Sequence, residues 1–199
     1  MTKRVLDLGI SLALLLFFSP AFLIISILII LSDGFPVFFR QERVGKDGKT
    51  FVILKFRSMR KPPKGSNNDF TPGDKSRITR VGNFLRKTKL DELPQLINVL
   101  LGEMSLVGPR PEVKQWVNAY PKQWALVHTI RPGITDPASI KFRNEEEILA
   151  KSNDPTQTYR NEVLPQKLEI YTSYVNKNTV LGDFKILIRT ISAVLLKSH

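Results

Sequence analysis

The sequence contains no cysteine, and its only histidines are His128 and His199. The lack of cysteine excludes disulfide bonds, thiol nucleophiles and cysteine-ligated zinc. With two histidines, a catalytic triad or a histidine-rich metal site has little to be built from. The chain therefore points away from thiol, zinc and triad chemistry.

Acidic residues are scarce in one block of the chain. The 199 residues carry a net charge of +12, and residues 40–90 contain fifteen Lys and Arg against four acids. Nearly the whole excess of positive charge lies in this block. It indicates an anionic partner: nucleic acid, an anionic membrane face or a phosphorylated substrate. The length suits one domain with room for an appendage.

Charge is absent from residues 8–32, which form a long apolar run. The run is too long for a signal peptide and ends without a small-x-small cleavage site, so it predicts a membrane segment. Ser19-Pro20 interrupts the run, and a proline in this position bends a helix. At about 1.5 Å per residue, neither half alone crosses about 30 Å of hydrocarbon.

Basic residues flank this run on both sides, Lys3 and Arg4 before it and Arg40 and Arg43 after it. Because positive residues favour the cytoplasmic side of a membrane, we expect a re-entrant hairpin that enters and leaves by the same face. The alternative is a slightly kinked spanning helix with a translocated N-terminus.

After Pro36, two apolar runs flank a turn containing two glycines, which predicts a β-hairpin. The "GKDGKT" of this turn is no P-loop, because Arg43 stands where that motif needs a glycine. Alternation in "FVILKFR" places Lys55 and Arg57 on one face, either as a solvated strand end or as two cations facing a phosphate. Residues 61–76 are predicted to form a long polar loop, a lid or a plain surface loop.

Apolar residues at helical spacing predict a helix from about residue 93 to a stop at Gly102. Its start has two interpretations. Thr88 and Asp91 resemble a capping box. Alternatively the helix begins at Leu90 or Asp91, and Pro94 lies in the first turn. The Asp91-Glu92 pair would then sit at the helix N-terminus, whose dipole stabilises negative charge. An ionised carboxylate there can bind a divalent metal or act as a nucleophile.

Further cations follow this helix. Arg110 lies between two prolines, in a stiff turn suited to bidentate contact with phosphate. Arg131, Lys141 and Arg143 lie in and beyond a Pro- and Gly-rich loop. Helical spacing returns over residues 159–174, and residues 181–195 have one apolar face, typical of a core helix or of a helix at a membrane interface.

The segments "RQERVGKDGKTFVILKFRSMR" and "LRKTKLDELPQLINVLLGEMSLVGPRPE", with the apolar run broken at Ser19-Pro20, resemble the bacterial sugar transferase family, the monotopic phosphoglycosyl transferases. The resemblance extends to about Arg143 and fits the small, catalytic-domain-only form. It implies a mostly helical α+β fold. A re-entrant membrane hairpin would occupy residues 1–35, and a cytoplasmic interfacial catalytic domain residues 36–199, with a small β-hairpin and amphipathic helices.

By this resemblance, the protein moves a sugar phosphate from a UDP-sugar to a membrane polyprenol (undecaprenyl) phosphate and releases UMP, the first membrane step of glycoconjugate assembly. It uses Mg²⁺. Asp91 is then the nucleophile, which forms a covalent phosphosugar, and a metal ligand, with Glu92 supporting it. The expected phosphate-binding residues are Lys55, Arg57, Arg86, Arg110, Arg131 and Arg143. Asp136 departs from the family, which often has glycine there.

Two other functions compete with this one. A membrane-bound phosphodiester hydrolase would use the same carboxylates with water as acceptor. A membrane-anchored nucleic-acid-binding protein would explain the basic charge, but it requires stacking aromatics or a recognition motif, which the sequence lacks. We therefore expect UDP-sugar, polyprenol phosphate and the lipid bilayer as partners, and no nucleic acid. The expected location is the bacterial inner membrane, with the catalytic domain facing the cytoplasm. The oligomeric state stays open, a homodimer included.

Overall fold

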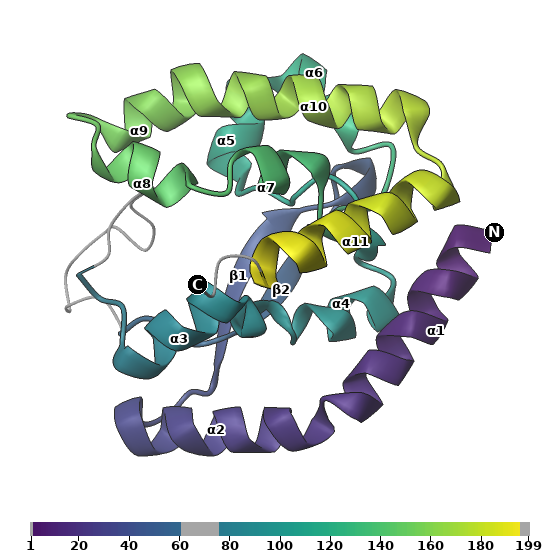
Figure 1. The fold of residues 1–199 in the computed structure, drawn as a ribbon. Helices are drawn as coiled ribbons and strands as arrows, with labels where there is room; N and C mark the ends of the chain where they lie inside the picture. Colours follow the sequence, from purple (N-terminus) through teal and green to yellow (C-terminus); the bar gives the residue numbers. More distant parts are fainter. Residues whose placement is uncertain (1, 61–75, 196–199) are drawn as a thin grey trace.

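The computed structural model describes residues 2–60 and 76–195. The loop predicted at 61–76 therefore lies outside the described residues, except for its last residue. The fold is α+β and mostly helical, as expected (Figure 1). In chain order the elements are α1 (Thr2–Phe17), α2 (Ser19–Asp33), β1 (Phe38–Val44), η1 (Lys46–Gly48), β2 (Thr50–Phe56), α3 (Arg80–Thr88), η2 (Leu90–Glu92), α4 (Gln95–Leu101), β3 (Ser105–Val107), α5 (Lys114–Ala119), α6 (Pro121–Val127), β4 (Gly133–Thr135), α7 (Pro137–Lys141), α8 (Glu145–Ala150), α9 (Pro155–Thr158), η3 (Tyr159–Val163), α10 (Leu164–Lys177) and α11 (Val180–Leu195).

The apolar N-terminal run forms two helices joined at the predicted break. α1 and α2 meet at an angle of 60°, with Ser19 and Pro20 in the first turn of α2. The Ser19 hydroxyl donates to the Leu16 carbonyl at 2.8 Å, next to the interruption that Pro20 causes. Among the described helices none is by itself long and apolar enough to cross a membrane, whereas the bent pair together has that length and composition.

Both ends of the bent pair are bound to the same globular body. At the start of α1, Lys3 donates to the Val107 carbonyl at 3.0 Å. One turn later, the Asp7 carboxylate accepts from the Ser105 hydroxyl at 2.8 Å. At the end of α2, Arg57 donates to the carbonyl of Asp33 at 2.8 Å. The two ends of the apolar pair are therefore both bound to the predicted catalytic-domain part of the chain.

The predicted hairpin is present. β1 and β2 pair antiparallel, in a register that runs from Phe38 opposite Phe56 to Val44 opposite Thr50. The turn between them is the short helix η1, in which Asp47 and Gly48 have positive φ angles of 56° and 72°. It is a strand connection, as the sequence predicts.

The remaining elements form a helical body around a short parallel pair, β3 and β4, which the sequence did not reveal. Its core contains Trp116, Trp124 and Tyr171, packed between α5, α6 and α10. The helical spacing predicted for residues 159–174 is confirmed by η3 and α10.

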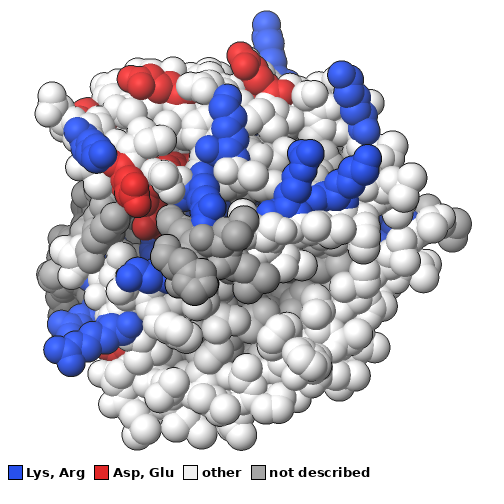
Figure 2. Space-filling model, viewed as in Figure 1, with Lys and Arg blue, Asp and Glu red and all other residues white. Residues whose placement is uncertain are grey.

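The exposure of the last helix, α11, distinguishes between the two interpretations of its apolar face, a core helix or a helix at a membrane interface. Leu187 packs against the core, but a row of large apolar side chains is at least half exposed: Leu181, Phe184, Ile188 and Ile191. A core helix would bury this row, so the structure favours a helix at an interface. In Figure 2 many Lys and Arg side chains lie on the upper part of the molecule and a further group lies at the lower left, whereas the bottom of the molecule, over α1 and α2, carries almost no charge.

The two tethered ends of the apolar pair lead to a topology prediction. The chain has no cysteine of its own, so Thr2→Cys and Lys46→Cys each introduce a single thiol, at exposed positions. Because both ends are bound to one body, we expect a membrane-impermeant maleimide to label both variants from the cytoplasmic side only. The measurement compares intact spheroplasts with inverted vesicles. Labelling of Thr2→Cys from the outside, with Lys46→Cys labelled from the inside, would show a spanning helix.

Candidate active site

The Asp91-Glu92 pair lies in the single-turn helix η2, between α3 and α4. The Thr88 hydroxyl donates to the Phe84 carbonyl at 2.9 Å and so closes α3, which makes the capping-box interpretation wrong. Lys89 then adopts a left-handed conformation with φ of 59° and redirects the chain. α4 begins at Gln95, directly after Pro94. Pro94 is therefore the N-cap of α4, where a missing N–H costs little. The helix starts later than the predicted Leu90 or Asp91, because those residues form the separate turn η2.

Glu92 is the centre of a buried ionic cluster. Lys55, near the end of β2, donates to Glu92 Oε1 at 2.8 Å. Arg110, in the turn after β3, binds the same carboxylate through both terminal nitrogens, with Nη1 at 3.4 Å from Oε2. The Glu92 side chain is 11% exposed, against 19% for Lys55 and 28% for Arg110. Two segments distant in the sequence, carrying Lys55 and Arg110, thus meet at the Glu92 carboxylate.

The charges of this cluster stabilise one another. Burial acts to raise the pKa of Glu92, but Arg110 and Lys55 outweigh it and hold that pKa well below its usual value. The Glu92 charge raises the pKa of Arg110 well above its ordinary value. Burial lowers the pKa of Lys55, and Glu92 opposes this effect. Glu92 is therefore ionised at neutral pH, and both cations are oriented by it.

Asp91 has a different environment from its neighbour. Its side chain is buried, and Oδ1 accepts no hydrogen bond from the part of the chain that the structure describes. Burial first, and the Glu92 charge second, raise the pKa of Asp91, while Lys55, Lys89 and Arg86 act to lower it. The direction is opposite to the one that the helix dipole alone predicts. A carboxylate with a raised pKa is more basic, and Oδ1 is a buried oxygen that has no hydrogen-bond partner among the described residues.

A divalent cation fits this carboxylate. Within residues 2–60 and 76–195, no group of three or more His, Asp or Glu side chains converges as a complete metal site. Mg²⁺, however, is usually bound through one or two carboxylates, together with water and substrate phosphates. The buried Asp91 Oδ1 is an oxygen of that kind, without a hydrogen-bond partner in the part of the chain that the structure describes.

The structure places the other predicted phosphate-binding residues apart from this cluster. Arg57 caps the end of α2, and Arg143 is exposed in the turn after α7. Arg86 forms an ion pair with Glu146 on α8, although its charge still acts on Asp91. Arg131 donates to the Gly102 carbonyl at 2.7 Å, at the far end of α4. Of the six cations, Lys55 and Arg110 share the carboxylate beside Asp91.

Asn98 is a positioning residue that the sequence analysis missed. Its side-chain oxygen accepts from the Leu54 N–H at 3.0 Å, and its amide donates to the Val52 carbonyl at 2.8 Å. Both groups lie on the edge of β2 that faces α4. Asn98 thereby joins the strand that carries Lys55 to the helix that follows Asp91. A polar residue on the buried face of an apolar helix was the available signal.

Two further acids support the site. Glu112 accepts from Arg43 at 3.1 Å and from the Tyr159 hydroxyl, which fixes the chain just after Arg110. Asp136 is fully buried and caps α7 by accepting from the Ser139 N–H at 2.9 Å. Its negative charge also reaches Arg110. The sequence "DPAS" has the form of a helix start, with an N-cap aspartate followed by proline.

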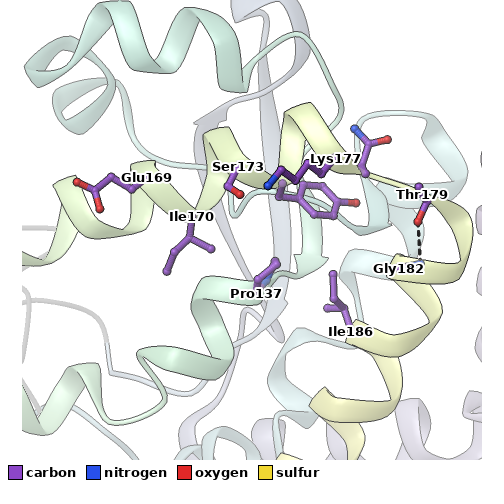
Figure 3. A pocket seen from close by; sticks show the side chains of 10 residues that line it. Pro137, Glu169, Ile170, Ser173, Lys177, Thr179, Gly182 and Ile186 are labelled. Carbon is purple, nitrogen blue, oxygen red and sulfur yellow. Dashed lines mark hydrogen bonds between the residues drawn. The ribbon is translucent and has the colours of Figure 1, made fainter.

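A cavity of about 410 Å³ lies away from the ionic cluster, between α7, α10 and α11. Figure 3 shows Ile170, Pro137 and Ile186 at this cavity, with Lys177 and Thr179 near its upper rim. None of the predicted catalytic or phosphate-binding residues lines it.

The shared carboxylate predicts a loss of stability in Glu92→Gln. The substitution leaves Lys55 and Arg110 without their charge partner. We expect the free energy of unfolding to fall by about 3 kcal/mol, at the low end for breaking a buried pair because both cations stay partly exposed. Thermal unfolding in detergent should show this as a Tm several degrees lower. Glu42→Gln, at an exposed position on β1, is the control. A Tm equal to that of the control would contradict the role of Glu92 as the anchor.

Comparison with known proteins places the chain in a family. Residues 1–197 match the family described as bacterial sugar transferase. Over 197 residues the chain is 37% identical to UDP-glucose:undecaprenyl-phosphate glucose-1-phosphate transferase of Escherichia coli K12, covering 95% of this chain and 39% of that protein. It is 38% identical to the uncharacterized sugar transferase EpsL of Bacillus subtilis 168, covering 98% and 87%.

A third relative, the UDP-N-acetylgalactosamine-undecaprenyl-phosphate N-acetylgalactosaminephosphotransferase of Aeromonas hydrophila, is 40% identical over 97% of this chain and 43% of its own length. The chain thus spans less than half of the Escherichia coli and Aeromonas relatives and most of EpsL. The match over nearly every residue shows that this chain belongs to the bacterial sugar transferase family.

Proposed function

We propose that this protein transfers a sugar 1-phosphate from a UDP-sugar to undecaprenyl phosphate or a related polyprenol phosphate, and releases UMP. The observation that carries the proposal is the buried oxygen of Asp91, which has no hydrogen-bond partner among the described residues, beside two cations that share the Glu92 carboxylate. The names of the Escherichia coli and Aeromonas relatives describe sugar phosphate transfers of this class. The transfer would begin the assembly of a glycoconjugate, such as an exopolysaccharide.

The geometry suits a two-step transfer. An Asp91 carboxylate oxygen attacks the phosphorus that carries the sugar, and a new P–O bond forms. The bond from that phosphorus to the bridging oxygen breaks, and its electron pair leaves with UMP. A phosphate oxygen of the polyprenol then attacks the same phosphorus, which frees the Asp91 carboxylate. Burial favours the first step, because it makes the Asp91 carboxylate more basic.

Attack of a carboxylate on an anionic phosphate meets like-charge repulsion. Lys55 and Arg110 can offset it by binding the non-bridging phosphate oxygens, and Glu92 holds both cations in place. When bound, Mg²⁺ would add positive charge between Asp91 and the substrate phosphates. The role that fits Glu92 best is that of an orienting residue.

The contacts that bind both ends of the α1–α2 pair also support a placement of the protein in the membrane. We propose that residues 1–35 form a re-entrant hairpin in the bacterial inner membrane, with residues 36–199 as a catalytic domain on the cytoplasmic face. The support is the 60° bend and the contacts that bind both ends of the pair to one body. This arrangement keeps Asp91 near the level of a lipid phosphate.

The covalent step gives the sharpest test. Enzyme, Mg²⁺ and a suitable UDP-sugar without polyprenol phosphate should release about one UMP per enzyme and add the mass of a sugar phosphate to a peptide that contains Asp91. Asp91→Asn should show neither, with turnover abolished, because an amide is a poor nucleophile. Intact-protein mass spectrometry and UMP release measure both, across a series of UDP-sugars.

Other outcomes of this experiment support other mechanisms. Continued UMP release without polyprenol phosphate would favour a hydrolase with water as acceptor. Release that requires both substrates at once, with no adduct trapped, would favour direct transfer and reduce Asp91 to a metal ligand.

The charges around Asp91 predict a pH dependence. Asp91 must be ionised to attack, so activity falls as the pH decreases through its pKa. Lys89 acts to lower that pKa. Lys89→Gln removes this charge, and the acidic limb of the kcat profile should therefore move to higher pH. Lys89→Arg keeps the charge and serves as the control. An acidic limb that is the same in both variants would mean that the limb does not report Asp91.

A further inference from the structure

Two arginines meet at the C-terminal end of α4, at the opposite end from Asp91. Arg131 donates through Nε to the Gly102 carbonyl at 2.7 Å. Arg4, from the first turn of α1, donates to the carbonyls of Met104 at 3.3 Å and Leu100 at 3.4 Å. The end of a helix carries free carbonyls and partial negative charge, which explains why both side chains gather there.

Within the described residues no salt bridge neutralises this pair, and the charge of Asp7 only partly offsets the effects of burial and of Arg131 on the pKa of Arg4. The charge of Arg131 acts against that of Arg4, and within residues 2–60 and 76–195 neither arginine forms a salt bridge. The hydrogen bonds of two acids close to the pair in the chain go to other groups: Asp7 binds Ser105 and the Leu106 N–H, and Glu103 binds Asn98. Among the described residues Arg131 donates only through Nε, and its two terminal nitrogens form no hydrogen bond with them.

The surroundings of the pair are apolar and face outward. Val5 on α1 is 68% exposed, and Leu101 at the end of α4 is 67% exposed. α1 runs beside α4 here, and from this end its apolar length continues toward the bend (Figure 1). Exposed apolar side chains next to half-buried arginines are typical of the depth at which lipid headgroups meet the hydrocarbon.

The pair is too far from Asp91 to act on the reacting phosphates. Ten residues lie between Asp91 and Gly102, and at a helical rise of about 1.5 Å per residue this run spans roughly 16 Å. A phosphate held by Arg4 and Arg131 is therefore a different phosphate from the one at Lys55 and Arg110.

We propose that Arg4 and Arg131 form a binding site for the headgroup phosphate of an anionic phospholipid. Two guanidinium groups offer paired N–H donors to the phosphate oxygens, and Val5 and Leu101 contact the acyl chains of the same lipid. The bound lipid neutralises the two like charges and fixes the depth at which α1 enters the membrane. The proposal depends on the membrane placement of α1 and is independent of the chemistry at Asp91.

The test measures thermal unfolding of the full-length protein in mild detergent, with phosphatidylglycerol or phosphatidylcholine added. Phosphatidylglycerol should raise the Tm in a saturable manner, whereas phosphatidylcholine should not. Arg131→Gln should weaken the apparent phosphatidylglycerol affinity roughly tenfold or more, as expected for the loss of a charge-assisted hydrogen bond. Arg131→Lys should recover part of it. Native mass spectrometry should show one phosphatidylglycerol retained by the wild type and lost in Arg131→Gln.

Lys185→Gln is the matched control, because it removes one exposed cation from the interfacial helix α11 and should leave the phosphatidylglycerol affinity unchanged. Arg4→Gln should behave like Arg131→Gln. Should it fail to fold, Arg131→Gln decides the matter, since Arg131 lies outside α1. Equal phosphatidylglycerol affinities in the wild type and Arg131→Gln would overturn the proposed site. An equal loss of this affinity in Lys185→Gln and Arg131→Gln would also overturn it, because it would show general charge attraction. Loss of stabilisation by polyprenol phosphate in Arg131→Gln, with the phosphatidylglycerol effect intact, would assign the pair to the acceptor instead.

Discussion

The carboxylate of Glu92 is the contact on which the arrangement of the site depends. It binds Lys55 from β2 and Arg110 from the turn after β3, two segments that no local structure connects. Burying three charges costs free energy, because each charge loses its water. The cluster is stable because each cation offsets this desolvation cost for the carboxylate, and the carboxylate offsets it for both cations. Since Glu92 follows Asp91 directly in the chain, both cations are held at a set position relative to the buried Asp91 Oδ1.

Hydrogen bonds outside the cluster hold its three segments in place. The two-stranded sheet leaves one edge of β2 unpaired, and Asn98 supplies that edge with both an acceptor and a donor. The Glu112 carboxylate accepts hydrogen bonds from Arg43 and from the Tyr159 hydroxyl, and these bonds connect the turn after Arg110 to β1 and η3. Each partner is buried or partly buried, so an unmade bond would leave a polar group without water. The site is therefore supported by elements that do not themselves contact the reacting groups.

The apolar hairpin is also part of this body. Its first two turns carry Lys3, Arg4 and Asp7, whose side chains turn inward to β3 and to the end of α4. Lys3 also binds Asp183 on α11, which in turn accepts from the Tyr174 hydroxyl at 2.6 Å. The apolar pair and the exposed face of α11 are thus oriented together, and a membrane that holds one also meets the other.

Local features of the chain determined much of the fold. The bend at Ser19-Pro20, the hairpin around Gly48 and the helix end at Gly102 depend on a missing N–H or on a positive φ angle, which individual residues dictate. The Asp91-Glu92 pair as a candidate site, and the resemblance to the family, could also be recognised from the sequence. The partners of the basic residues were decided by tertiary structure. Arg57 caps a helix and Arg131 meets Arg4, while Lys55 and Arg110 share one acid. The raised pKa of Asp91 likewise comes from burial and a neighbouring charge. Charge interactions and desolvation act through space, so only the folded chain determines which groups meet and which lose their water.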